Sequence, residues 1–226
     1  MSKSEARKQK QLARKKAKRD EKRSQLARRT SDNPLVRLAG AEAWPVVAAF
    51  VPEQLWEHGI GQLVLARRCP DGRIACAVYL VDTYCLGVKN AFWNLMSEWE
   101  YDKLVRNVSS KGRLMAVAPE ALAKIVLESV AYAQSFGLPA HPDFRHARML
   151  LAGIDASQCA DTFHFGKDGK PLYINGPHDS PEKIKVIIQR LEASGGKFIV
   201  GMGLENGDAQ LMVDAPEDFT DDDEGM

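Results

Sequence analysis

The sequence predicts an α+β fold: a single domain of short β-hairpins in a mixed sheet packed with helices. Two segments have the pattern strand–turn–strand, and helical segments separate them, whereas a βαβ series would alternate strand and helix. With 226 residues, 45% of them hydrophobic, the chain can bury a core. The predicted domain spans residues 35–213. A basic helical arm (residues 1–34) precedes it, and an acidic disordered tail (residues 214–226) follows it.

The arm is predicted to be a helix that has no apolar face to bury. Residues 3–29 are almost all good helix formers and include no Gly or Pro. Their only sizeable apolar residues, Leu12 and Leu26, are two heptads apart, so the helix would be polar all round. We expect it to fray alone and to fold on binding. The polar cluster at residues 30–34, which ends in Pro34, marks the domain boundary.

The first part of the domain is predicted to hold a hairpin. Residues 44–51 and 55–56 are predicted as short helical pieces packed by aromatic side chains. Residues 61–68 and the apolar run at residues 74–81 are predicted strands. The turn between them, residues 70–72, is Pro-Asp-Gly, in which Pro fixes φ and Gly supplies a positive φ.

Helices dominate the middle of the chain. After a third strand at residues 84–88, we predict helices at residues 98–108, 119–136 and 142–152. The second of these begins with a Pro and is followed by Gly137, a residue suited to the position after a helix end.

A second hairpin is predicted at residues 162–166 and 171–175, around a turn with the sequence Lys-Asp-Gly-Lys. Ser180 then caps a helix that starts at Pro181 and stops at Gly195 and Gly196. Its core residues are predicted to be Ile184, Ile187, Ile188 and Leu191. Residues 197–202 and 209–213 are predicted strands, joined by a hairpin loop.

The net charge of +1 hides an asymmetric distribution. Residues 1–34 hold 13 Lys and Arg against 4 Asp and Glu, and residues 214–226 hold 7 acids and no base. The body between them has 18 bases and 19 acids and is close to neutral. The predicted nucleic-acid-binding residues are the basic side chains of the arm: Arg7, Lys8, Lys10, Arg14, Lys15, Lys16, Lys18, Arg19, Lys22, Arg23, Arg28 and Arg29.

The arm could bind nucleic acid, bind a membrane, or have no target. Its cations can release counterions from a phosphate backbone, which favours nucleic acid or a ribonucleoprotein. Residues 1–34 contain no aromatic residue, so recognition by charge and shape is expected rather than base-specific stacking. Leu12 and Leu26 are too few for an interfacial apolar face, so no membrane partner is predicted. A solvated arm without a target remains the alternative.

The sequence gives no cofactor, metal or nucleotide motif. The four cysteines lack a CxxC pair, and the glycines near Gly201 and Gly166 match neither GxGxxG nor GxxxxGK[ST]. Most cysteines lie in apolar runs, and no secretory signal or spanning segment is found, so reduced thiols in a cytoplasmic protein are expected.

Cys85 is the candidate nucleophile of the chain. Cys85 follows the apolar strand, and a Cys-His-Asp set would need His141, His146 or His164 with Asp82 or Asp143. A buried Cys that acts as a small hydrophobe is the commoner case, so no catalytic residue is assigned.

Three stretches, YLVDTYCLGVKNAF (residues 79–92), AHPDF (residues 140–144) and FGKDGKPLY (residues 165–173), resemble segments of an uncharacterised bacterial protein family. The resemblance extends over roughly residues 60–195. It implies a bacterial domain, but no activity and no catalytic residue.

The sequence therefore predicts a non-enzymatic, cytoplasmic accessory protein. Its arm would bind nucleic acid or a ribonucleoprotein without sequence specificity, and its body would recruit or regulate a protein partner. Two alternatives stay open: a small cysteine-dependent enzyme with Cys85 near its site, and a protein–protein interaction module whose arm and tail confer solubility.

Overall fold

The computed structural model describes residues 34–176, 179–203 and 209–214. The predicted arm, apart from Pro34, and the predicted tail after Asp214 lie outside these residues. The described part combines helices with two sheets, as an α+β protein does. It contains no helix long and apolar enough to cross a membrane.

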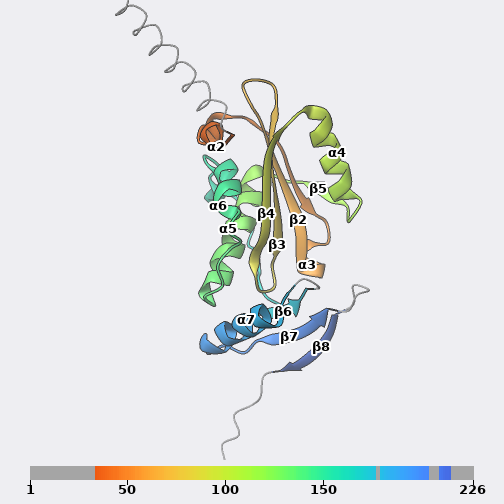
Figure 1. Ribbon diagram of the computed structural model, residues 1–226, viewed down its shortest axis with the longest axis vertical. Coiled ribbons are helices and arrows are strands. Elements are labelled where there is room, and N and C mark those ends of the chain that lie inside the picture. Colours follow the sequence, from red (N-terminus) through yellow and green to blue (C-terminus); the bar gives the residue numbers. More distant parts are fainter. Residues whose placement is uncertain (1–33, 177–178, 204–208, 215–226) are drawn as a thin grey trace, which may run out of the picture.

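The larger sheet has five antiparallel strands in the order β4-β3-β2-β1-β5 (Figure 1). The strands are β1 (Val46–Pro52), β2 (Ile60–Arg68), β3 (Ile74–Asp82), β4 (Gly87–Met96) and β5 (Leu114–Ala116). Chain neighbours pair from β1 to β4, so this part is a meander, and β5 returns to pair with β1. The predicted first hairpin is confirmed as β2 and β3, with Gly72 at φ 85° in the turn.

Helices cover both faces of this sheet. The helix α5 (Pro119–Ser135), the short α6 (Phe144–Ala147) and the 3-10 turn Arg148–Leu151 lie on one face, and α4 (Glu98–Ser109) lies on the other (Figure 1). Because successive strand residues point to opposite faces, Leu63 and Leu65 pack with α5 and α6, whereas Val64 packs with α4.

The smaller sheet has the order β6-β7-β8 and lies below the larger one in Figure 1. Its strands are β6 (Leu172–Asn175), β7 (Ile199–Gly203) and β8 (Ala209–Asp214). The helix α7 (Pro181–Ala193) connects β6 to β7, which pair in parallel. The predicted cap is confirmed, since the Ser180 side chain accepts a hydrogen bond from Lys183 N. The predicted antiparallel pairing of the last two strands is also confirmed.

A hydrophobic cluster joins the two sheets. It combines the β3–β4 turn with the end of α5 and with β6, α7 and the start of β7. Its buried residues are Cys85, Leu86, Ala133, Leu138, Tyr173, Ile187, Leu191 and Phe198. Backbone hydrogen bonds reinforce this contact, because Leu172 N donates to Tyr84 O at 3.1 Å and Gly166 N donates to Thr83 O at 2.9 Å. The short helices α2 (Pro34–Leu38) and α3 (Leu55–His58) complete the described helices, apart from 3-10 turns.

Two predictions of secondary structure are wrong. Residues 46–52 form the strand β1 rather than a helical piece, because they pair with β2 and β5 on either side. Residues 162–166 form no strand, although the predicted turn is present: Lys167 N donates to Lys170 O at 2.7 Å, and Gly169 has φ 77°. The partner of β6 is β7, which lies across a helix rather than across a turn.

Two further predictions are right in type and wrong in extent. The third strand starts at Gly87 and runs to Met96, since residues 84–86 form the turn before it. The predicted helix at residues 142–152 is only α6 followed by a 3-10 turn. The helices predicted at residues 98–108 and 119–136 are confirmed as α4 and α5.

Candidate functional site

The predicted nucleic-acid-binding residues, from Arg7 to Arg29, lie outside the described residues, so their role stays a prediction. The structure does show where the chain leaves the arm. Leu38, the last residue of α2, is 1% exposed and belongs to the core cluster of the larger sheet. The arm is therefore joined to the body through a helix whose end is fixed in the core.

Cys85, the candidate nucleophile, lies in the cluster between the sheets and is fully buried. Burial raises the pKa of its thiol, the charge of Asp82 raises it further, and Lys89 only partly offsets the two. Asp82 does not orient a histidine. Its Oδ1 accepts hydrogen bonds from Tyr84 N at 3.0 Å and Cys85 N at 2.9 Å, which shapes the β3–β4 turn. A thiol in this setting is neutral and inaccessible, unlike a poised nucleophile.

The candidate histidines have other environments. His141 Nδ1 lies 3.8 Å from Asp143 Oδ2, while His141 N donates to Val88 O at 2.9 Å. His164 is exposed. The structure therefore pairs His141 with Asp143, as the sequence allowed, but gives neither residue a role at the buried Cys85.

A polar cluster, missed by the sequence analysis, lies where the two sheets meet. We define this junction cluster as Asp82, Lys89, Tyr173, Asp179 and Lys183. The Asp179 side chain, 2% exposed, holds most of it together. Its Oδ1 is 2.6 Å from Lys183 Nζ, and its Oδ2 accepts from Tyr173 Oη at 3.2 Å and lies 3.7 Å from Lys89 Nζ. Residues from β4, β6 and α7 are thus tied to one carboxylate.

The two carboxyl groups of the junction cluster differ in their pKa. Burial raises the pKa of Asp82 to about 6, although backbone N–H groups and Lys89 oppose this shift. Burial also acts to raise the pKa of Asp179. Hydrogen bonds from Lys183 and Gly176 N, together with the charges of Lys89 and Lys183, outweigh burial, so the pKa of Asp179 lies below its usual value. Asp179 is the permanent anion of the cluster.

The position of Lys89 depends on a β-bulge. Val88 pairs with Val81 and Asn90 pairs with Leu80, so Lys89 is an extra residue in β4. Bulges re-aim a side chain relative to the regular alternation of a strand. The Lys89 ammonium lies beside Gly176, the residue after β6 of the smaller sheet. The approach is so close that a Cβ added at Gly176 would lie only 3.2 Å from Lys89 Nζ.

A hollow opens next to the junction cluster, with a volume of about 540 Å³. We call it the basic-rimmed hollow. It lies between β4, the α5–α6 connection and α7, and it is lined mostly by apolar side chains with Lys89, Lys183 and Arg190 among the charged ones. Its size falls within the range of small-molecule sites, roughly 300–1,000 Å³.

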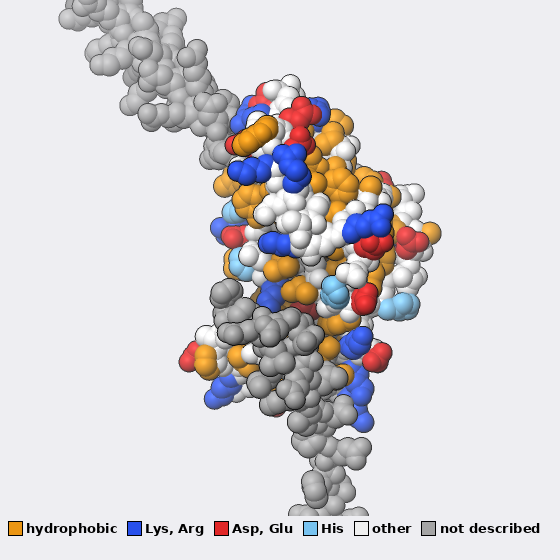
Figure 2. Space-filling view, turned by 90° about the vertical axis from the view of Figure 1, so that its right-hand side faces the viewer, with side chains coloured by type: hydrophobic (Ala, Val, Ile, Leu, Met, Phe, Trp, Pro, Cys, Tyr) orange, Lys and Arg blue, Asp and Glu red, His pale blue; other side chains and the backbone are white. Residues whose placement is uncertain are grey.

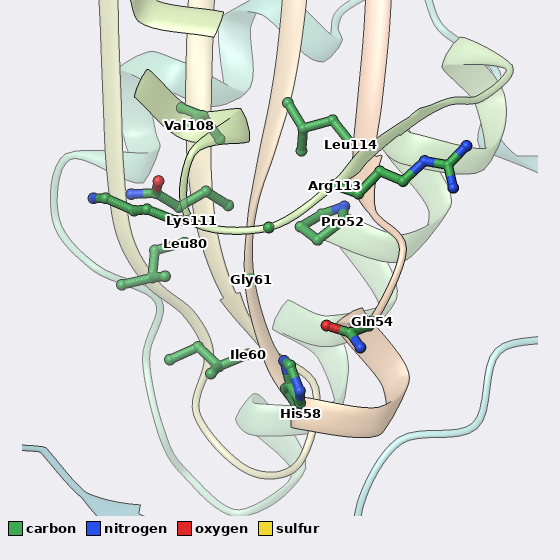
Figure 3. Close-up of a pocket in the computed structure, with 12 residues that line it drawn as sticks. Pro52, Gln54, His58, Ile60, Gly61, Leu80, Val108, Lys111, Arg113 and Leu114 are labelled. Atoms are coloured by element: carbon green, nitrogen blue, oxygen red, sulfur yellow. The ribbon is translucent and has the colours of Figure 1, made fainter. Parts of the chain in front are cut away.

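A second hollow, of about 380 Å³, lies on the α4 face of the larger sheet. Figure 3 shows Val108 and Leu114 at one end of this sheet-face hollow and His58 and Ile60 at the other. The side-chain oxygen of Gln62, which also lines it, is buried and has no hydrogen-bond partner. An acceptor in this state is a place where a ligand N–H or O–H could bind.

No group of three or more His, Cys, Asp or Glu residues in the described ranges is arranged to hold a metal ion. Comparison of the chain with protein-family models, with curated proteins and with solved structures found no match.

A sequence signal for the junction cluster exists only in part. Asp82 and Lys89 lie in the conspicuous stretch after the apolar strand, and Lys183 lies in a helix with a clear cap. What the sequence does not show is that residues 82–89 and residues 173–183 meet. That contact depends on the packing of one sheet against the other.

Proposed function

We propose that this protein is a non-enzymatic accessory protein that binds nucleic acid or a ribonucleoprotein through its basic arm. In this proposal the body recruits or regulates a protein partner. The observation that carries the proposal is the charge distribution: 13 Lys and Arg against 4 acids in residues 1–34, ahead of a body with 18 bases and 19 acids. A polyanion would interact with the arm far more strongly than with the body.

The charges on the surface of the body are mixed, which supports the arm as the polyanion-binding part. On the face shown in Figure 2, basic and acidic side chains are interspersed among apolar ones. Several exposed bases are paired, as in Arg68 with Glu98 at 3.2 Å and Arg37 with Asp71 at 2.9 Å. Mixed, paired charges of this kind do not create the single-sign field that attracts a phosphate backbone.

The mechanism is electrostatic. Each arm cation that contacts a phosphate releases a condensed counterion, so affinity falls steeply as salt rises. Residues 1–34 lack aromatic side chains, so nucleobases cannot stack on aromatic rings of the arm. Binding therefore discriminates among nucleic acids by charge density and shape. The α2 helix keeps the arm attached at a fixed place on the body, since Leu38 is buried there.

The test is a salt titration of binding to duplex DNA, structured RNA and ribosomes. The full chain is compared with a chain lacking residues 1–33, which keeps α2 intact because this helix starts at Pro34. For duplex DNA we expect the logarithm of the affinity to fall with log salt by about 0.9 per phosphate contacted, and the deletion to abolish binding near physiological salt.

A matched variant separates charge from chain length. Replacing the twelve predicted binding residues of the arm by Gln keeps a helix-forming segment but removes its charge. This variant should behave like the deletion. Binding that survives in either variant, or full-length protein that fails to bind any of the three polyanions, would overturn the proposal.

A second candidate function is a protein–protein interaction module. It is favoured by exposed apolar residues on the α4 face of the larger sheet, where Ile60 is 41% and Phe92 is 47% exposed. A chain lacking residues 1–33 that keeps its full cellular role would support this candidate over the first. The cysteine-dependent enzyme receives no such support, because Cys85 is fully buried and the pKa of its thiol is raised.

A further inference from the structure

We propose that the basic-rimmed hollow binds a small amphipathic anion: an unbranched alkyl chain that ends in one carboxylate. The proposal does not depend on the arm, because residues 86–190 supply the whole lining. Three features carry it: an apolar interior, a cationic rim built by specific contacts, and an excess of cations over acids in the lining.

The interior of the hollow is apolar on all three sides. Leu86 comes from the turn before β4 and Val88 from β4, Leu138 and Pro139 come from the α5–α6 connection, and Val186 and Ile187 come from α7. Val186 is 44% exposed although it faces a hollow lined by other apolar residues. An alkyl chain laid here would cover this surface, which water now contacts.

The rim carries three cations whose positions are fixed. Arg190 Nη1 donates to Gly137 O at 2.9 Å, which joins α7 to the α5–α6 connection. Lys183 is held by Asp179, and Lys89 is directed to the same place by the bulge in β4. A guanidinium has five N–H donors and an ammonium has three, so each cation keeps donors for a ligand oxygen.

The lining of the hollow carries more cations than acids. Lys89, Lys183 and Arg190 line it together with one acid, Glu182, whereas Asp179 and Asp82 belong to the junction cluster and are not part of the lining. Glu182 is engaged at the start of α7, where hydrogen bonds from its own backbone N–H and from Ser180 lower its pKa. An anionic head group therefore complements this rim, whereas a cationic amphiphile would be repelled.

The test is calorimetric titration of the full chain with hexanoate, octanoate and decanoate. Each added CH₂ should strengthen binding by up to about fourfold until the hollow is filled. Decanol should bind about tenfold more weakly than decanoate, and decylamine should not bind detectably, because the rim selects the carboxylate. Decyl phosphate distinguishes a carboxylate site from a general anion site.

Two variants place the ligand in the hollow. Val186→Glu puts a charge on the apolar wall and should weaken decanoate binding at least about tenfold. Lys183→Gln should reduce the preference for decanoate over decanol about threefold or more, while decanol itself binds as before. The control is Leu127→Glu, a residue on α5 that is 38% exposed and does not line the hollow, and it should leave binding unchanged.

Several results would overturn the proposal. They are the absence of saturable decanoate binding, equal affinity of the Val186→Glu and Leu127→Glu variants for decanoate, or equal binding of decylamine and decanoate by the unmodified chain.

The acidic tail is the competing occupant of a cationic rim. This is tested with a chain that lacks residues 215–226 and a synthetic peptide of the same residues. If the peptide binds this chain saturably and decanoate does not, the hollow is assigned to the tail instead. Val186, Lys183 and Leu127 are exposed positions on α-helices, so each variant should fold, and a thermal unfolding measurement checks this.

Discussion

At the scale of single residues, Arg67 is a buried cation of the larger sheet whose guanidinium needs several hydrogen-bond acceptors. It is 3% exposed, and its guanidinium donates to four backbone carbonyls: Leu150 O at 2.7 Å, Trp44 O at 2.7 Å, Ala152 O at 2.6 Å and Glu42 O at 3.3 Å. Burial lowers the pKa of Arg67, although nearby groups oppose this shift. Arg67 thus ties the segment before β1 to the 3-10 turn after α6.

We expect Arg67→Met to lower the free energy of unfolding by about 3 kcal/mol, because buried carbonyls lose their donors. Arg67→Lys, which offers fewer donors in a different geometry, should recover only part of this loss. Urea denaturation measures both. The neighbouring Arg68→Met is the control, since the Arg68 side chain is 43% exposed and its ion pair with Glu98 lies at the surface, and it should cost less than about 1 kcal/mol. Equal losses at the two positions would contradict the interpretation of Arg67.

Asp82 makes stability depend on pH in an unusual direction. Its pKa of about 6 in the folded chain lies above the ordinary value of 3.8. Between about pH 4 and pH 6 the folded state therefore keeps a proton that the unfolded chain has released. The contribution of Asp82 to stability is highest below about pH 4, declines as the pH rises to about 6, and is constant above that.

Asp82→Asn removes this titration and keeps the oxygen that accepts from Tyr84 N and Cys85 N. The stability of the variant relative to the wild type should rise by about 3 kcal/mol from pH 4 to pH 7. Urea denaturation across this range measures the difference, and Asp102→Asn on exposed α4 controls for the loss of a carboxylate. Curves for Asp82→Asn and wild type that stay parallel would refute a raised pKa.

At the scale of elements, the fit of the β3–β4 turn against α5 depends on Gly87. This residue has φ 63°, and a Cβ added to it would lie 2.5 Å from Ser129 O and 3.0 Å from Ala133 Cβ. Gly87→Ala should cost about 3 kcal/mol, from the left-handed backbone and from the collision with α5. Gly72→Ala is the matched control, because Gly72 has φ 85° but open space around it, and it should cost only about 1–2 kcal/mol. Thermal unfolding of the two variants would show whether the closer contact adds to the backbone cost.

The elements that the sequence predicts well are those with local signals. A Pro-Asp-Gly turn defined the first hairpin, and Ser180 with Pro181 defined the start of α7. β1 was missed because a short apolar run fits a helix or a strand equally well, and only pairing with β2 and β5 decides between them. β6 was given the wrong partner because a parallel partner lies beyond a helix, where no turn residue marks it.

The candidate site was predictable only as separate pieces. The position of Cys85 after an apolar strand suggests a nucleophile, but its burial is a property of the packing between the sheets. The role of Lys89 follows from a bulge, and the pairing of β4 with β3 is needed to show which residue of the strand is the extra one. Asp179 gains its importance from Tyr173, Lys89 and Lys183, which come from three different elements.

At the scale of the whole molecule, charge is concentrated toward the two ends of the sequence. Residues 215–226 contain six of the seven acids of the predicted tail, and the arm has a balance of +9. We expect deletion of residues 215–226 to strengthen polyanion binding by about tenfold at low salt, because the tail competes with phosphate for the arm. The gain should vanish toward 1 M salt, where the screening length is about 3 Å. Fluorescence anisotropy with a labelled duplex measures it.

A tail with Asn and Gln in place of its acids is the matched control for this deletion, since it preserves length. It should give the same gain as the deletion. If the deletion strengthens binding but the neutral tail does not, the tail would act by bulk rather than by charge.

The parallel pairing of β6 with β7 has a consequence for the order in which the protein is made. A ribosome releases β1 to β5 together with α4 before any residue of the smaller sheet, and these strands can already pair with one another. β6 then emerges without a partner, since β7 starts only at Ile199. During that interval Leu172 and Tyr173 can contact only the residues that precede them, such as Tyr84 and Cys85, and lack the cover that α7 and β7 give them in the finished fold. The smaller sheet can therefore close onto the larger one only after β7, which ends at Gly203, has left the ribosome.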